Sequence, residues 1–95
     1  MEDAESDFTW DLGKQALNIQ KHGVDFYTAS LVFEDPKRRM AFDDEHGAGE
    51  RRVFCFGLVH GRILTVRFVY RDGKIRIFGA GYWRKGAKYY AEKNR

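Results

Sequence analysis

The sequence has a single cysteine and no long apolar run, and both scarcities narrow the classes of protein that it can be. Cys55 has no partner for an internal disulfide, and its place in an apolar, strand-like run predicts a buried, unreactive thiol. No apolar stretch reaches the ~18–20 residues that span a bilayer. The acidic start, residues 1–7, is unlike a secretory or transit peptide, so we expect a cytoplasmic protein without a membrane segment.

Motifs that bind metals or cofactors are also missing. The histidines and the cysteine lack the spacing of zinc ligands, and the sequence contains no phosphate-binding loop, dinucleotide fingerprint or serine-nucleophile motif. The acidic run Asp43–Glu45 and the histidines His46 and His60 are typical of solvated loops. We therefore expect no cofactor and no metal site.

The chain does have apolar material for one domain. Of its 95 residues, 43% are hydrophobic and 16% are aromatic, which is enough for one core in a chain too short for a second. We expect a disordered tail over residues 1–7 and a single domain over residues 8–95, which opens with a short strand-like piece, Phe8–Trp10.

Charge is divided unevenly between the two halves of the chain. Residues 1–50 hold 5 Lys/Arg against 12 Asp/Glu, whereas residues 51–95 hold 12 against 2, so the halves carry −7 and +10. A basic segment inside a small domain is the usual electrostatic footprint of a polyanion binder. Because the basic half is also the most strand-like, we expect its cations on a sheet surface that handles nucleic acid.

The first half of the chain predicts two helices. Asp11 can cap a helix that runs to about His22 and stops at Gly23. The apolar stripe that we expect to face the core consists of Leu12, Ala16 and Ile19. The opposite face carries Lys14, Asn18 and Lys21. Asp25 can cap a second helix, with Phe26, Ala29, Ser30 and Phe33 inside, and Asp35-Pro36 ends it because the residue before proline is pushed out of the α region.

The second half changes to the period of strands. Three segments are rich in Val, Ile, Phe and Tyr, and they are 51–59, 62–70 and 74–80. The dipeptides His60-Gly61 and Asp72-Gly73 between them predict tight hairpin turns. A further strand is expected over 37–42, and a basic helix over 84–93. The sequence thus predicts an α+β fold, with two N-terminal helices packed on a small antiparallel sheet of three to four strands, plus a C-terminal helix.

Hairpin register assigns the side chains of this sheet to two faces. One face is nearly all apolar and suits the two helices. The other mixes arginines with aromatic rings, namely Arg52, Phe54, Phe56, Arg67, Arg76 and Phe78. On this register Val66 lies opposite Gly79, and Thr65 lies opposite Ala80.

Three interpretations of the mixed face stay open. Guanidinium groups bind phosphate and aromatic rings stack on unpaired bases, which favours an RNA-binding surface. Alternatively, the C-terminal helix packs on this face and the arginines extend to its rim. In the third interpretation, a partner protein covers it.

A few residues outside this face are candidates for chemistry. His22 can act as an acid or base near neutral pH, although a histidine at a helix C-terminus also simply complements the helix dipole. Tyr82 and Trp83 precede two cations, Arg84 and Lys85, and they either stack on a base or a partner or close the core.

Taken together, several of these residues resemble a known family. The set comprises Trp10-Asp11, Lys14, Asn18, Lys21-His22-Gly23-Val24, Phe33, Asp35-Pro36, Glu50-Arg51, Gly57, Arg62, Arg76-Ile77 and Gly79-Ala80. From Phe8 to Tyr90 the chain resembles the BrnT family, toxins of type II toxin–antitoxin modules. The resemblance implies a RelE-like fold and a ribonuclease activity that inhibits translation. It also implies a hetero-oligomer with a DNA-binding BrnA antitoxin, which neutralises the toxin and represses the shared operon.

The chain departs from the family pattern near the expected active site. Where the family commonly reads Ser-Ala-Arg after the last strand, this chain has Gly79-Ala80-Gly81, and Ala87 replaces an acidic residue of the following helix. Either other cations carry cleavage, or this member is weakly active and mainly binds its partner.

These observations predict a metal-independent ribonuclease with RNA as its substrate. We expect Arg67, Arg76 and Arg84 to hold phosphate. His22 is the preferred acid or base, ahead of Lys21, Tyr70 and Tyr82. The expected RNA-binding residues are Lys21, Arg52, Tyr82, Trp83 and Lys85. The alternatives are a non-catalytic or weakly active partner-binding protein of the same module and a plain RNA-binding domain.

Overall fold

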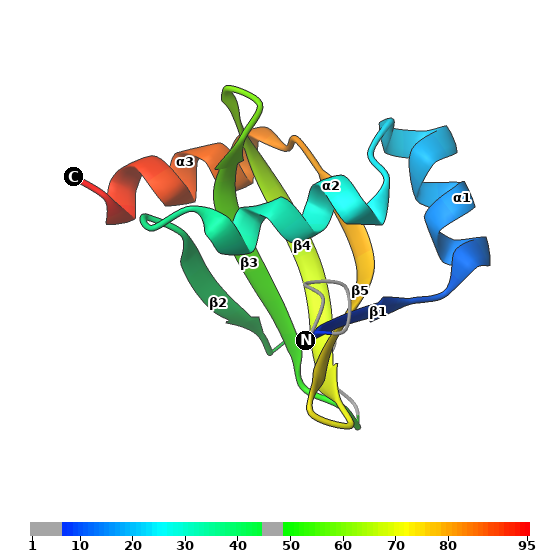
Figure 1. The fold of residues 1–95 in the computed structure, drawn as a ribbon. Helices are drawn as coiled ribbons and strands as arrows, with labels where there is room; N and C mark the ends of the chain where they lie inside the picture. Colours follow the sequence, from blue (N-terminus) through cyan, green and yellow to red (C-terminus); the bar gives the residue numbers. More distant parts are fainter. Residues whose placement is uncertain (1–6, 45–48) are drawn as a thin grey trace.

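The computed structural model describes residues 7–44 and 49–95. The predicted tail, residues 1–7, lies outside these ranges except for Asp7, and so does His46. The elements, shown in Figure 1, are β1 (Phe8–Trp10), α1 (Leu12–His22), α2 (Phe26–Ser30), η2 (Leu31–Glu34), β2 (Arg39–Asp43), β3 (Arg52–Val59), β4 (Arg62–Arg71), β5 (Lys74–Gly81) and α3 (Arg84–Lys93).

A five-stranded sheet with the order β1-β5-β4-β3-β2 forms the centre of the molecule. The pairs β2–β3, β3–β4 and β4–β5 are antiparallel, whereas β1 runs parallel to β5. The predicted α+β class is therefore confirmed, but an antiparallel sheet of three to four strands is wrong. The sheet is mixed because the short piece Phe8–Trp10 pairs along the outer edge of β5, a partner distant in sequence that no hairpin signal reveals.

The two predicted hairpin turns are confirmed. His60 and Gly61 have φ angles of 53° and 81°, and Asp72 and Gly73 have 54° and 75°. Positive φ at both central residues is the mark of the type I′ turn, whose twist matches that of the strands it joins.

The predicted register fails at one point in β5. Phe68 pairs with Ile77 as expected, but Arg67 pairs with Gly79, so Phe78 is an extra residue in a β-bulge. Beyond the bulge Val66 pairs with Ala80, not with Gly79, and Thr65 pairs with Gly81, not with Ala80. A bulge reverses the alternation of side chains, and Ala80 therefore enters the core.

The core lies between one face of the sheet and the helical segment formed by α2 and η2, as predicted (Figure 1). Phe26, Ala29 and Val32 on this segment are fully buried. Gly57 of β3 allows the close approach, because a Cβ atom there would lie 2.8 Å from the Val32 carbonyl oxygen. Full burial of the Phe26 and Val32 side chains stabilises the fold by about 1.5–3 kcal/mol each. The core members on the sheet are Val53, Cys55, Val59, Leu64, Val66, Phe68, Ile77 and Ala80.

Helix α1 begins and ends as predicted, but the prediction that its apolar stripe faces the core is wrong. Asp11 caps its start through a hydrogen bond from the Lys14 N–H, and Gly23 ends it in the left-handed conformation. The stripe residues Leu12, Ala16 and Ile19 are exposed. The helix instead packs against β5 through Asn18, the residue of α1 that is buried. Asn18 takes this position because its amide satisfies backbone groups that an apolar side chain would leave unpaired.

Helix α3 covers part of the second face of the sheet. Gly86 lies against Thr65, and the Tyr89 ring packs on Phe56 with a centroid distance of 4.7 Å. Phe56 is therefore buried, which agrees with the interpretation that this face packs under the C-terminal helix. The other end of the same face, with Arg52 and Arg76, is not covered by this contact. Cover by the C-terminal helix therefore accounts for only part of the face, and the RNA and partner interpretations stay open for the rest.

Candidate nucleic-acid interface

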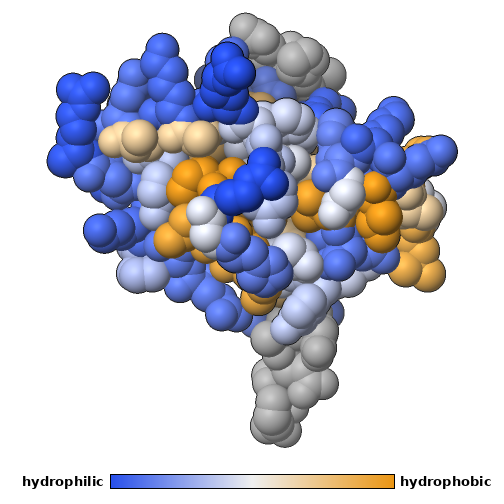
Figure 2. Space-filling model, turned by 90° about the horizontal axis from the view of Figure 1, so that it is seen from above, coloured by the Kyte–Doolittle hydropathy of each residue, from blue (hydrophilic) through white to orange (hydrophobic). Residues whose placement is uncertain are grey.

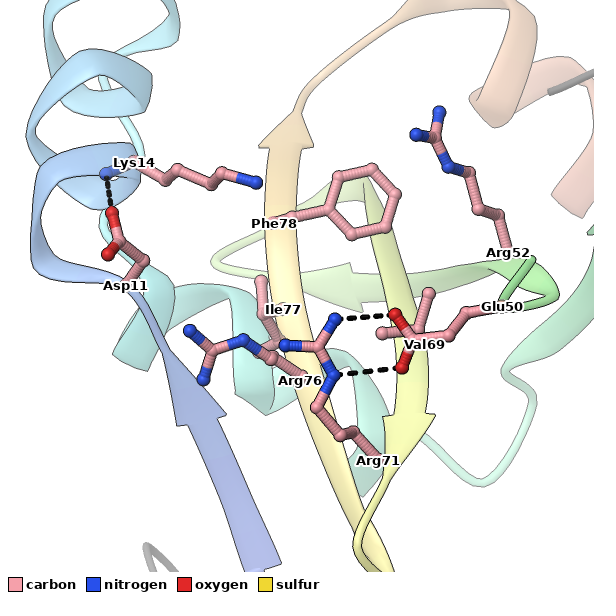
Figure 3. Close-up of a pocket in the computed structure, with 9 residues that line it drawn as sticks. All are labelled: Asp11, Lys14, Glu50, Arg52, Val69, Arg71, Arg76, Ile77 and Phe78. Carbon is pink, nitrogen blue, oxygen red and sulfur yellow. Dashed lines mark hydrogen bonds and ion pairs between the residues drawn. The ribbon is translucent and has the colours of Figure 1, made fainter. Parts of the chain in front are cut away.

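The uncovered part of the second face holds a pocket of about 400 Å³. Four cations and two carboxylates line it, together with the apolar residues Val69, Ile77 and Phe78 (Figure 3). The charged residues are Lys14, Arg52, Arg71, Arg76, Asp11 and Glu50. The pocket therefore carries a positive excess and offers both cations for an anion and carboxylates that can accept protons.

The β-bulge places an aromatic ring among the arginines. Phe78, the extra residue of β5, lies beneath two guanidinium groups, with the Cζ atoms of Arg67 and Arg52 at 5.0 Å and 5.3 Å from its ring centroid. The Arg67 side chain also lies over Gly79, where a Cβ atom would be 3.5 Å from its Cδ. Cation–π contacts of this kind restrict the two arginines while their polar groups stay available. The half-buried Arg67 thus borders the pocket, and Arg52 and Arg76 line it.

A bidentate ion pair fixes the carboxylate of Glu50 in the pocket. Arg71 donates from Nε and a terminal nitrogen to the two carboxylate oxygens at 2.8 Å and 2.5 Å. The Arg71 hydrogen bonds, aided by the charges of Arg71 and Arg76, hold the pKa of Glu50 below its ordinary value. Glu50 therefore remains ionised and oriented beside Arg76.

The first turn of α1 supplies the remaining charged groups. Asp11 and Lys14 are joined by the capping hydrogen bond of 2.9 Å, which fixes the position of the turn. Figure 3 shows the Lys14 side chain extending from the helix toward Phe78. A helix from the acidic half of the sequence thus completes a pocket whose other cations come from the basic half.

The remaining predicted site residues lie outside this pocket. His22, at the C-terminal end of α1, packs edge-on against the Trp83 ring with a centroid distance of 5.1 Å. Trp83 in turn covers Gly81, and the exposed Arg84 and Lys85 follow it in the first turn of α3. These four residues form a second cluster, separate from the pocket.

Tyr82 and Lys21 belong to neither group. Tyr82 is partly buried against the core, and the Cζ atom of Arg62 lies 4.3 Å from its ring centroid. Lys21 is exposed near the end of α1. The structure therefore brings Arg52, Arg67 and Arg76 together, and the roles of all the predicted site residues stay predictions.

Sequence reasoning missed Lys14, Glu50 and Arg71 as pocket residues. In retrospect, local signals point to Lys14 and Glu50, whereas none points to Arg71. Lys14 follows the capping residue Asp11 by three positions, so it lies on the turn that starts the helix. Glu50 is the last carboxylate before a basic segment, so arginines lie close to it in sequence and are candidates for ion pairs.

The thiol of Cys55 behaves as predicted. Its side chain is fully buried in the core, and burial raises its pKa to about 12. A thiol in this setting stays protonated and takes no part in chemistry near neutral pH. Within the described ranges, no group of three or more His, Cys, Asp or Glu side chains is placed to bind a metal ion.

Comparison with protein families decides the identity of the chain. Residues 10–86 match the family described as "Ribonuclease toxin, BrnT, of type II toxin-antitoxin system". The chain belongs to this family. No curated protein matches the sequence. The matched range includes α1, the whole sheet from Trp10 onward and the start of α3, and thus every residue that lines the pocket.

Membership of the BrnT family confirms the coarser functional predictions. The chain is a ribonuclease toxin of a type II toxin–antitoxin system, so RNA is its target and an antitoxin protein is its partner. Within the described residues, no helix is long and apolar enough to cross a membrane.

Proposed function

We propose that this BrnT toxin cleaves RNA in the pocket beside Phe78, without a metal cofactor, and that the cleavage inhibits translation. The observation that carries the proposal is the convergence of Arg52, Arg76 and Lys14 on a single pocket that also holds an oriented carboxylate, Glu50. Cations in fixed positions can supply the charge that a metal ion supplies in other nucleases.

Phosphate binding is the task of the cations. Guanidinium groups bind phosphate through paired hydrogen bonds, and Arg52 and Arg76 reach the pocket from neighbouring parts of one sheet face. Arg67 of β4 lies over the same Phe78 ring and adds a third guanidinium group to this cationic surface. The partly exposed ring of Phe78 offers a surface on which a base next to the scissile phosphate stacks.

Cleavage then needs a base and an acid. In the RelE-like chemistry that we expect, the ribose 2′-hydroxyl attacks the adjacent phosphorus and the bond to the 5′-oxygen breaks, leaving a 2′,3′-cyclic phosphate and a 5′-hydroxyl. We assign Glu50 as the base that takes the 2′-hydroxyl proton and Lys14 as the acid that protonates the 5′-oxygen. Arg76 and Arg52 stabilise the negative charge that develops on the phosphoryl oxygens.

The second cluster has a different part in this scheme. His22 lies eight residues beyond Lys14 on α1, which corresponds to about 12 Å along a helix axis. A single scissile phosphate held beside Lys14 is therefore out of reach of His22. Trp83, Arg84 and Lys85 form a second contact for the RNA strand, and His22 orients Trp83 through their ring contact.

The partner that fits this module is a BrnA-like, DNA-binding antitoxin. The chain departs from the family pattern at Gly79-Ala80-Gly81, and in the proposed scheme Arg52, Arg67 and Arg76 supply the cations for cleavage. The competing function is a weakly active, partner-binding protein of the same module, favoured by the absence of an arginine at Gly81.

A cleavage assay with one matched pair of variants tests the proposal. The purified toxin is incubated with a labelled RNA oligonucleotide in EDTA, and we expect fragments that end in 2′,3′-cyclic phosphate. Arg76→Ala should reduce the cleavage rate by about 100-fold or more, because it removes a charge aimed at the developing anion. Lys74→Ala, the control, removes a cation from the same strand outside the pocket. Cleavage that requires a divalent metal, or full activity of Arg76→Ala, would contradict the proposal.

A further inference from the structure

The outward face of α1 holds more apolar than polar side chains, with Gln20 among the apolar ones, which is the reverse of what a surface helix normally shows. Leu12, Leu17 and Ile19 are 74%, 54% and 46% exposed, and Ala16 lies exposed between them. In Figure 2 orange side chains gather at the right-hand edge, the side on which α1 lies in Figure 1. Scattered exposed leucines need no explanation, but an apolar group on one helix marks an interaction site.

Hydrogen bonds from the polar side of α1 explain why its apolar stripe faces outward. Asn18 donates to the backbone carbonyl oxygens of Val24 and Ala80 at 2.9 Å each, and the side-chain Oε1 of Gln15 accepts from the Phe26 N–H at 2.8 Å. These bonds fix which side of the helix faces the sheet. The apolar residues on the other side therefore do not contribute to the described core, and their burial is left for another molecule.

The charge of α1 distinguishes between two molecules that could cover this face, a second copy of the chain and an acidic partner. Residues 12–22 carry Lys14 and Lys21 and no carboxylate, so a second copy of the chain would bring like charges together. A segment with apolar side chains flanked by Asp or Glu would instead cover the stripe and pair with the exposed Lys21, whereas Lys14 extends toward the pocket. Membership of a type II toxin–antitoxin family supplies a protein partner for this face, the antitoxin.

From these observations we infer that the antitoxin docks an acidic amphipathic segment along α1, on the face formed by Leu12, Ala16, Leu17 and Ile19. The position also explains neutralisation, since α1 contributes Asp11 and Lys14 to the pocket and a partner along the helix covers that side of it. The blocking of the pocket rests on the function proposed above, whereas the docking rests on the apolar face and its charges.

Substitutions on the exposed face test the docking. Binding of the antitoxin encoded in the same operon is measured by calorimetry with the full-length toxin and the double variant Leu12→Gln/Ile19→Gln. Neither residue lines the pocket, so RNA cleavage should stay unchanged while the affinity for the antitoxin falls at least 50-fold. Leu58→Gln is the matched control, an exposed leucine on β3 that should leave binding intact.

A second pair of variants tests the charge of the partner and does not depend on the first. Ala16→Glu and Ala16→Lys place side chains of similar length at the centre of the face, and an acidic partner should bind the Glu variant at least 5-fold more weakly than the Lys variant. Thermal unfolding establishes that each variant is folded. Undiminished binding of Leu12→Gln/Ile19→Gln, or of both Ala16 variants, would overturn the inference, as would equal binding of Glu and Lys at position 16.

Three further outcomes are informative. If wild-type toxin dimerises at micromolar concentration and Leu12→Gln/Ile19→Gln does not, a second copy covers the face and the inference is overturned. If the toxin does not cleave RNA at all but the binding differences appear, the proposed function fails and the docking stands. If cleavage occurs but saturating antitoxin does not inhibit it, the blocking of the pocket is wrong.

Discussion

The side-chain amide of Asn18 bonds both backbone groups of Ala80, donating to its carbonyl oxygen at 2.9 Å and accepting from its N–H at 3.2 Å. The pairing of β1 with β5 ends at Trp10 and Ile77, so no strand among residues 7–44 and 49–95 satisfies the outer edge of β5 at Ala80. One buried amide therefore takes the place of a strand residue and ties α1 to the sheet.

Replacing Asn18 should destabilise the protein strongly. Asn18→Ala leaves the buried N–H and carbonyl of Ala80 unpaired, and we expect a loss of about 3 kcal/mol in the free energy of unfolding. Urea unfolding followed by circular dichroism measures this change. The control Gln20→Ala, on the exposed side of the same helix, should change it by less than about 0.5 kcal/mol. Equal stabilities of the two variants would show that the amide bonds contribute nothing net.

The limits of most elements could be predicted because local signals determine them. Asp11 and Gly23 delimit α1, and His60-Gly61 and Asp72-Gly73 set the hairpins. The side of α1 that faces the sheet could not be predicted, because the demand for polar partners arises at Ala80, which is 62 residues away from Asn18. A hydrophobic pattern contains no information on such a tertiary hydrogen bond.

Local patterns also predicted part of the candidate site. Alternation along the hairpins placed Arg52, Arg67 and Arg76 on one face, and the structure agrees. The bulge at Phe78 is a register shift that depends on packing at the end of β5, and it determines which ring lies under the arginines. Glu50 and Lys14 join the pocket through long-range contacts of a loop and a helix, for which the sequence gives no distance.

Glu50 should be necessary for cleavage but not for binding of RNA. Glu50→Gln keeps the size of the side chain and a hydrogen-bond acceptor for Arg71 but removes the proton acceptor, so the single-turnover rate should fall about 100-fold or more. The affinity for an uncleavable 2′-deoxy oligonucleotide should stay the same or increase, since a negative charge has left the pocket. Wild-type cleavage by Glu50→Gln would exclude this carboxylate as the base.

The partner of Glu50 should control the pH dependence of the reaction. The hydrogen bonds from Arg71 lower the pKa of Glu50, so Arg71→Ala should raise that pKa toward or above its ordinary value. A base must be deprotonated to act, and the acid limb of the pH–rate profile should consequently move to higher pH in Arg71→Ala. Profiles of kcat/KM between pH 3.5 and 8 measure the shift. A profile that only falls in height, with its acid limb unmoved, would argue that Arg71 binds RNA and does not tune Glu50.

Asp35 should make the stability of the fold sensitive to acid. Partial burial acts to raise its pKa, but hydrogen bonds from the Tyr90 hydroxyl at 2.7 Å and from the N–H groups of Leu58 and Lys37 outweigh burial and lower it. A carboxyl whose pKa is lowered on folding contributes stability that is present above its ordinary pKa and is lost as pH falls through the folded value. Urea unfolding at pH 7 and pH 3 should therefore show a smaller difference for Asp35→Asn than for wild type. Glu92→Gln, at an exposed carboxyl, is the control.

The contact between Gly86 and Thr65 should couple α3 to the sheet. A Cβ atom on Gly86 would lie 1.9 Å from Thr65 Oγ1, so in Gly86→Ala either the helix or the Thr65 side chain must shift, which should cost about 2–4 kcal/mol despite the better helix propensity of alanine. Thr65 Oγ1 is buried and has no hydrogen-bond partner among the described residues, so Thr65→Ala alone should cost little. The double variant should recover part of the loss, because removing Oγ1 relieves the shortest contact while Phe56 Cδ1 still lies 3.1 Å away. A double-mutant cycle on the free energy of unfolding measures this coupling, and strictly additive effects would mean that Thr65 Oγ1 is not what the added methyl group meets.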